Sequence, residues 1–94
     1  MTEEIVLDGK KFTGHRIATE HTALLLIQGR AGFLACTYLN AEVADRLGDA
    51  AAIVTGVKTF ADMYEAKVIR VSKRAAELGV ATGMTGREAL LRLG

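Results

Sequence analysis

The sequence predicts a small α/β (α+β) domain, in which helices pack on a mixed sheet of about five strands. Three observations indicate this fold. Apolar stretches at 24–27 and 33–39 flank a turn with two glycines, and a third apolar stretch covers 50–54. A short helical pattern separates the second stretch from the third, and further helical patterns follow. The 94 residues fit one domain, because a chain of this length forms one hydrophobic core.

Residues 1–22 are predicted to form a pair of N-terminal strands. A short strand ends at the turn signal Asp8-Gly9, and an extended segment follows in which Phe12 and Ile17 are the large apolar residues. A hairpin with so few apolar side chains buries little surface by itself. We therefore expect it to lean on the main sheet, formed by residues 23–94, or to pair with another copy of the chain.

Residues 24–57 are predicted to form the centre of the sheet. The stretches 24–27 and 33–39 form an antiparallel hairpin, and Asn40 and Gly48 bound a short helix as N-cap and C-cap. Because a helix connects it to the preceding strand, the strand at 50–54 is expected to be a parallel neighbour, reached by a right-handed crossover. The connection is short, so an antiparallel arrangement also fits.

The C-terminal part is predicted to form two to three helices that pack on the sheet. Thr59 starts a helical pattern whose apolar positions recur at intervals of three and four up to Leu78. This pattern allows one continuous helix, but the β-branched residues at 68–71 favour a break near Ala66. Thr85 and Glu88 form a capping-box signature that begins a last helix.

Three phrases carry a resemblance to a known family: 32–36, 49–57 and 83–90. In this order and spacing they resemble the YunC-like family of small bacterial and archaeal proteins, domain of unknown function 1805, over nearly the whole chain. The resemblance implies an α/β domain whose N-terminal strands assemble a homotetramer, with no established reaction. Many relatives have a smaller residue than Thr37 after the cysteine. Relatives often have proline just after the position of Ala66, which favours the broken helix.

Charge and composition bear on partners and compartment. Twelve basic and eleven acidic residues leave a net charge of +1 without a basic cluster, so we expect no nucleic-acid partner. No apolar stretch approaches the roughly 20 residues of a membrane helix, and the start Met-Thr-Glu-Glu is unlike a secretory signal. A single cysteine suits a reducing interior, so a cytoplasmic location is expected.

The predicted ligand site lies where helices begin. If the strands at 33–39 and 50–54 are parallel, the helices capped by Asn40 and Thr59 start at one edge, and their N-termini favour an anion or a carboxylate. A third helix start with a guanidinium, at 85–87, could join them, although ordinary capping explains these residues equally well. The candidate ligand-binding residues are Asn40, Thr55, Gly56, Thr59, Thr85, Gly86 and Arg87.

Two other residues are candidates for catalysis. Cys36 would need a base nearby to form a thiolate, and neither His15 nor His21 is placed beside it by its spacing. Cys36 would otherwise be a small buried apolar side chain. Asp49 is the second candidate, no metal site is expected, and no cofactor is indicated. Two hypotheses result: an oligomeric module that binds a small anionic metabolite, and a small enzyme with a subunit-interface site that uses Cys36 or Asp49.

Overall fold

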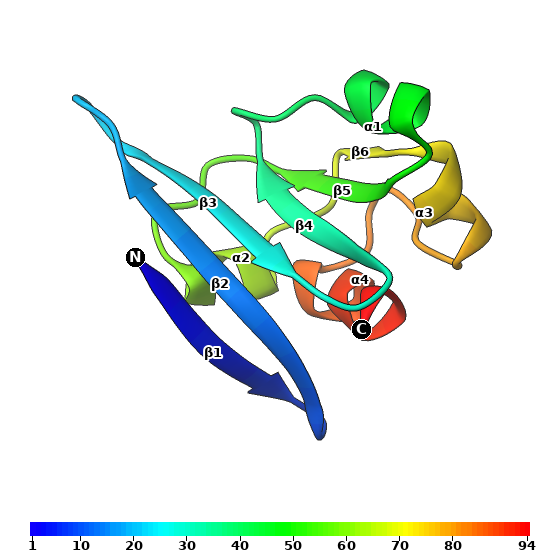
Figure 1. Cartoon of the computed structure of the whole chain (residues 1–94), viewed down its shortest axis with the longest axis horizontal. Helices are drawn as coiled ribbons and strands as arrows, with labels where there is room; N and C mark the ends of the chain where they lie inside the picture. The colour runs from blue at the N-terminus through cyan, green and yellow to red at the C-terminus, as the bar shows by residue number, and fades with distance from the viewer.

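Six strands form one mixed sheet in chain order, from β1 to β6, and four helices pack on it (Figure 1). The computed structural model describes all residues 1–94. The predicted α+β class is confirmed, with one strand more than expected. None of the four helices has the length and hydrophobicity of a membrane-spanning segment. The elements are β1 Thr2–Leu7, β2 Lys10–Ala18, β3 Ala23–Gln28, β4 Gly32–Cys36, α1 Ala41–Leu47, β5 Ala50–Val54, α2 Phe60–Glu65, β6 Arg70–Val71, α3 Lys73–Glu77 and α4 Gly86–Leu93.

The strands β1 to β4 are joined by tight turns and pair antiparallel. Asp8 and Gly9 both have positive φ, at 50° and 80°, which is the backbone that a two-residue hairpin turn requires. The register places Ile5 opposite Phe12, and Ile27 opposite Leu34. Because side chains alternate along a strand, these residues share one face of the sheet. The N-terminal hairpin therefore leans on the main sheet and contributes to its core.

β4 and β5 are parallel, as the crossover predicts. Gly32 lies opposite Ala50 at the start of the pair, and Cys36 lies opposite Val54 at its end. A side chain at Gly32 would collide with the backbone of Ala50, so glycine is required there. Between the two strands α1 begins at its predicted N-cap, where the Asn40 side chain accepts a hydrogen bond from the Glu42 amide at 2.8 Å.

The continuous helix from residue 59 to 78 does not form, and the break near Ala66 is confirmed. Ala66 is extended, with ψ of 147°, and the chain then runs along the edge of the sheet as β6. Val68 becomes a buried core residue in this extended segment. The β-branched residues thus form sheet structure, and the remaining apolar positions belong to two separate short helices, α2 and α3.

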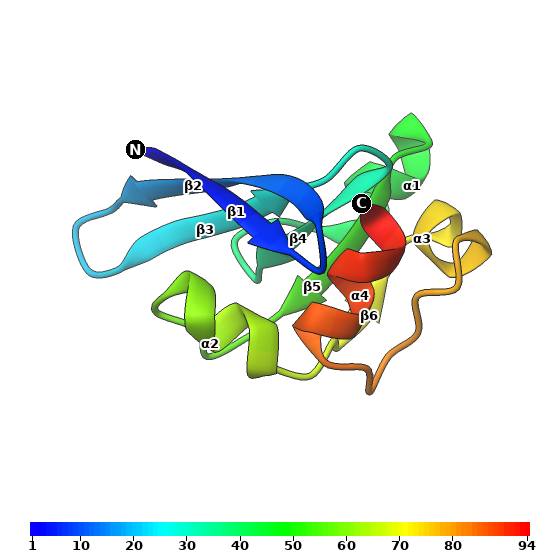
Figure 2. The ribbon, with the colours of Figure 1, turned by 90° about the horizontal axis from the view of Figure 1, so that it is seen from below.

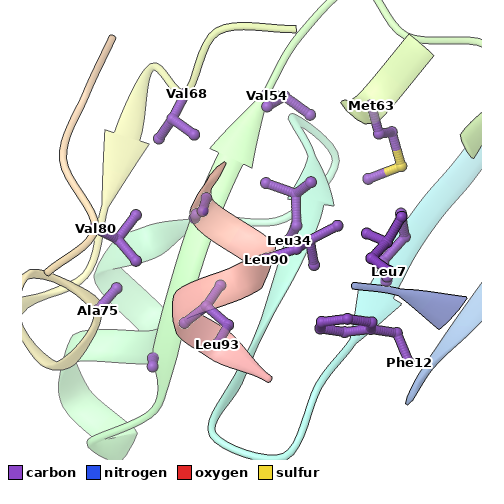
Figure 3. Packing of buried hydrophobic residues seen from close by; sticks show 14 of the residues in the cluster. Leu7, Phe12, Leu34, Val54, Met63, Val68, Ala75, Val80, Leu90 and Leu93 are labelled. Carbon is purple, nitrogen blue, oxygen red and sulfur yellow. The ribbon is translucent and has the colours of Figure 1, made fainter. Parts of the chain in front are cut away.

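The core lies between the sheet and the helices α2 and α4, on what we call the inner face. Figure 2 shows α2 and α4 on this side of the sheet and α1 on the other, which we call the outer face. Met63 of α2 and Leu90 of α4 point toward Leu34 of the sheet (Figure 3), and all three are fully buried. Apolar burial of this kind stabilises the fold by about 25 cal/mol per Å².

Ser72 is the one buried polar residue, and it ties β5 to the start of α3. Its hydroxyl donates to the carbonyl of Asp49 at 2.8 Å and accepts from the amide of Ala51 at 2.9 Å. The same oxygen accepts from the amide of Ala75 at 3.3 Å, which makes Ser72 the N-cap of α3. One side chain therefore satisfies backbone groups of Asp49 and Ala51, which lie 23 and 21 residues before it, and of Ala75 in α3.

Replacement of this hydroxyl should destabilise the protein. Ser72→Ala leaves the amide of Ala51 and the carbonyl of Asp49 without their partner, at a cost of about 2 kcal/mol in the free energy of unfolding. Urea denaturation followed by circular dichroism measures this difference. Thr82→Ala, at an exposed turn position, is the control and should change the free energy little. Equal stability of the two variants would contradict the role of Ser72.

Candidate functional site

The carboxyl ends of β4 and β5 lie side by side, and the chain leaves them toward opposite faces. After β4 it enters α1 on the outer face, and after β5 it enters α2 on the inner face (Figure 2). Ligands in α/β proteins bind at such switch points, because the diverging connections leave a crevice outside the strand ends. We call the segments 37–40 and 55–58 at this position the rim.

Two open depressions lie at the rim. The larger has a volume of about 610 Å³, and the smaller one of about 260 Å³. Thr37 and Tyr38 line both, so the two form adjacent parts of one surface. The larger is also lined by Leu39, Asn40, Ala41, Glu42, Asp45, Ile53, Ile69, Arg70 and Val71, and the smaller by Thr22, Ala23, Cys36, Gly56, Val57 and Lys58.

Two cationic side chains that line the depressions form no ion pair, whereas two nearby carboxylates accept hydrogen bonds from backbone amides. Lys58 and Arg70 have no carboxylate within 4.0 Å, and the guanidinium of Arg70 donates one hydrogen bond, to the carbonyl of Ile69 at 3.0 Å. Asp45 accepts from the amide of Lys73, and Asp62 accepts from the amide of Lys58. The wall of the larger depression therefore carries one cation, Arg70, and two carboxylates, Glu42 and Asp45, and the smaller depression carries Lys58.

The predicted residues at the two strand ends have different surroundings. Asn40 and Gly56 line the depressions, and Gly56 has a positive φ of 72° with open space around it. Thr59 caps α2 and accepts from the amide of Asp62 at 3.0 Å, and Thr55 is exposed beside it. These two threonines adjoin the depressions without lining them.

The predicted residues of α4 lie away from the rim. Thr85 forms a capping box with Glu88, and Arg87 donates to Asp8 at 2.8 Å in the turn between β1 and β2. Gly86 is buried, and a side chain there would collide with the carbonyl of Met63 in α2. The structure thus gives these residues packing and capping contacts, and it does not bring them together with Asn40 and Gly56.

The two candidate catalytic residues lie at opposite ends of the parallel pair. Cys36 ends β4, is buried, and its sulfur accepts a hydrogen bond from the amide of Leu25 at 3.4 Å. Asp49 precedes β5 and is exposed near the other end of the sheet, about 15 Å away along the strands. The two therefore cannot act on one bond.

Neither histidine lies beside the thiol of Cys36. His15 belongs to the outer face of β2 and hydrogen-bonds Gln28 at 3.2 Å, and His21 lies near Glu20 in the turn after β2. No three His, Cys, Asp or Glu side chains come together as metal ligands would. Sequence analysis missed two cationic residues that line the depressions, Lys58 of the rim and Arg70 of β6. Lys58 directly precedes the cap Thr59 in the sequence, which is a signal for its position. Arg70 lies in the β-branched segment 68–71, and no local signal indicated that this segment pairs with β5.

These observations define a small α+β domain with an open polar depression at the ends of two parallel strands. Residues 35–93 match the domain of unknown function DUF1805, and the chain belongs to this family, as its sequence motifs predicted. The match begins within β4 and includes the whole rim.

Two relatives agree with this assignment over almost their full length. The uncharacterized protein YunC of Bacillus subtilis is 30% identical over 94 residues, which are 95% of this chain and 92% of that protein. The crystal structure of a protein of unknown function, TA1206 from Thermoplasma acidophilum, superimposes with a TM-score of 0.95 at 35% identity. The superposition covers 100% of this chain and 92% of the TA1206 chain.

The capping box of α4 should make stability depend on pH. Hydrogen bonds from the amide and hydroxyl of Thr85 lower the pKa of Glu88 below its ordinary value of 4.5. A carboxylate whose pKa is lowered by folding stabilises the folded state above its unfolded pKa, and this contribution is lost as the pH falls. Wild type should therefore exceed Glu88→Gln in free energy of unfolding at pH 7, and the difference should shrink below pH 4.5. A difference independent of pH would contradict this.

Proposed function

We propose that this protein is an oligomeric module that binds a small anionic metabolite at the rim. The observation that carries the proposal is the depression of about 610 Å³ at the switch point, with the unpaired guanidinium of Arg70 in its wall. Its volume is in the range of small-molecule sites, about 300 to 1,000 Å³. The unpaired Cys36 fits a reducing cytoplasm as the compartment.

The lining residues support a ligand with a charged end and an apolar part. Arg70 and the side-chain amide of Asn40 can donate to a carboxylate or a phosphate, because the oxygen of Asn40 is already engaged in capping α1. Ile53 lies opposite Arg70 in the β5–β6 register, so its apolar side chain is on the same face of the sheet as the guanidinium. Lys58 would add a second cation from the smaller depression.

A thermal-shift screen tests the binding proposal. The probes are inorganic phosphate, citrate, dicarboxylates and nucleotides, and a compound present at one hundred times its Kd adds about 2.7 kcal/mol to the free energy of unfolding. Arg70→Met should abolish the shift, because it removes the guanidinium but keeps an apolar side chain. Arg30→Met is the control: Arg30 is an exposed arginine without an ion pair in the β3–β4 turn.

Two results would contradict the rim as the site. One is a screen in which no anionic compound raises the melting temperature. The other is a shift that Arg70→Met and Arg30→Met retain equally.

We also propose that the N-terminal strands assemble the oligomer, through the free edge of β1. Met1 and Arg16 exchange both backbone hydrogen bonds, at 2.9 and 3.1 Å. In an antiparallel pair such residues alternate with residues whose backbone groups point away, so Thr2, Glu4 and Val6 offer unpaired amides and carbonyls. Two copies of β1 can therefore pair antiparallel and form one continuous sheet.

Proline at the free edge tests this assembly. Glu4→Pro removes an outward-pointing amide and leaves the hydrogen bonds between β1 and β2 in place. Sedimentation velocity should show half the mass of wild type, with an unchanged circular dichroism spectrum. Glu4→Ala keeps the amide and is the matched control. If Glu4→Pro and Glu4→Ala sediment alike, β1 is not the contact.

A further inference from the structure

The larger of the two depressions has groups of opposite charge in its walls. Glu42 and Asp45 line it from α1, and because they are three positions apart they lie on the same side of that helix. Arg70 lines it from the edge strand β6, and its guanidinium has no carboxylate within 4.0 Å. The acids of α1 and the cation of β6 therefore line one depression without forming an ion pair.

Both carboxylates have oxygen atoms that a ligand can use. Asp45 accepts a hydrogen bond through Oδ1, from the amide of Lys73 at 2.6 Å, and Oδ2 has no partner in the chain. The carboxylate of Glu42 forms no ion pair, not even with Arg46 one turn further along α1. A carboxylate accepts hydrogen bonds and donates none, so the ligand group that complements these oxygens is a donor or a cation.

A ligand that carries acid groups alone does not match this mixture of charges. Its acid group can bind Arg70, but the two carboxylates of α1 then repel it across the same open space. A ligand with an ammonium group next to the acid group has no such conflict, because each of its charges meets the opposite sign. The walls of the depression therefore favour a ligand that carries both signs of charge.

We propose that the anionic metabolite is an amino acid with an acidic side chain. This inference rests on the binding function proposed above and names the chemical class of its ligand. The α-carboxylate binds Arg70, and the ammonium group donates to Glu42 and Asp45. The side-chain carboxylate binds Lys58 in the smaller depression. With two acid groups and one ammonium group, such a ligand is anionic at neutral pH.

The shape of the surface allows one ligand to use both depressions. Thr37 and Tyr38 line the larger and the smaller depression, so the two are continuous along this segment. Tyr38 is 55% exposed, and it offers a ring and a hydroxyl to the carbon chain between the two acid groups.

A matched pair of probes tests the ammonium group. L-Glutamate and glutarate have the same carbon chain and the same two carboxylates, and only L-glutamate has an ammonium group. Isothermal titration calorimetry of the wild-type protein should show that L-glutamate binds about tenfold more tightly or better, as expected for charge-assisted hydrogen bonds. L-Aspartate and succinate form the corresponding shorter pair, and the pair that fits the depressions should show this difference.

Glu42→Gln identifies the protein group that distinguishes the two probes. The variant removes one negative charge, keeps the shape of the side chain, and leaves the hydrogen bond from the backbone amide of residue 42 to Asn40 in place. It should weaken the binding of the amino acid about tenfold and should not weaken that of the dicarboxylate. Glu65→Gln is the matched control, because Glu65 is exposed on α2, has no ion pair and lines neither depression.

Lys58→Met tests the second carboxylate of the ligand. L-Glutamine has the size of L-glutamate but an uncharged side chain, so the wild-type protein should prefer L-glutamate. The Lys58→Met variant should lose this preference. Equal binding of L-glutamine and L-glutamate to the wild type would overturn the assignment of an acidic side chain.

Failure of this inference is distinguishable from failure of the proposed function. If amino acid and dicarboxylate bind the wild type equally and both depend on Arg70, anion binding is retained and the amino-acid inference is overturned. Equal effects of Glu42→Gln and Glu65→Gln would also overturn it, as would binding of inorganic phosphate or nucleotides without binding of either amino acid. A protein that binds none of these anions would contradict both proposals.

Discussion

The parallel pairing of β4 and β5 is the constraint on which the rest of the structure depends. It requires a crossover on one face, supplied by α1, and it places both carboxyl ends at the rim. All five residues of β5 are buried, because the strand has elements on both faces and neighbours on both edges. Small side chains at 50–52 allow this close approach, and Ser72 fixes β5 to the segment beyond it.

A second consequence of this pairing is that the two faces of the sheet differ in how many helices cover them. α2 and α4 pack on the inner face, where the hydrophobic core lies, so apolar burial on this face stabilises the fold. α1, a helix of seven residues, packs on the outer face, and several apolar side chains of this face remain exposed. The rim lies where these two faces separate, at the carboxyl ends of β4 and β5.

Local signals in the sequence were sufficient for much of this fold. The caps Asn40, Thr59 and Thr85 and the Asp8-Gly9 turn depend on neighbouring residues, and each is confirmed. The parallel pairing of β4 and β5 joins residues 18 positions apart, and it was predicted because a helical pattern between two strands indicates a crossover. β6 was not predicted as a strand, because its two residues are too few to show the alternation typical of a strand and are defined only by their pairing with β5. Periodicity alone also allowed a continuous helix there.

The position of the site was predictable from the sequence, but only some of the residues that form it were. Asn40 and Gly56 follow from the strand ends, whereas Arg70 reaches the rim only because the chain turns back as β6. The contact of Arg87 with Asp8 joins residues 79 positions apart, and no spacing rule indicates it.

The short length of β6 has a consequence for growth of the sheet. With two residues, this edge offers almost no hydrogen-bonding groups to an incoming strand. Head-to-tail stacking of β1 on β6, which would propagate into a fibre, therefore lacks its second docking edge. Edge pairing through β1 would therefore end after two molecules.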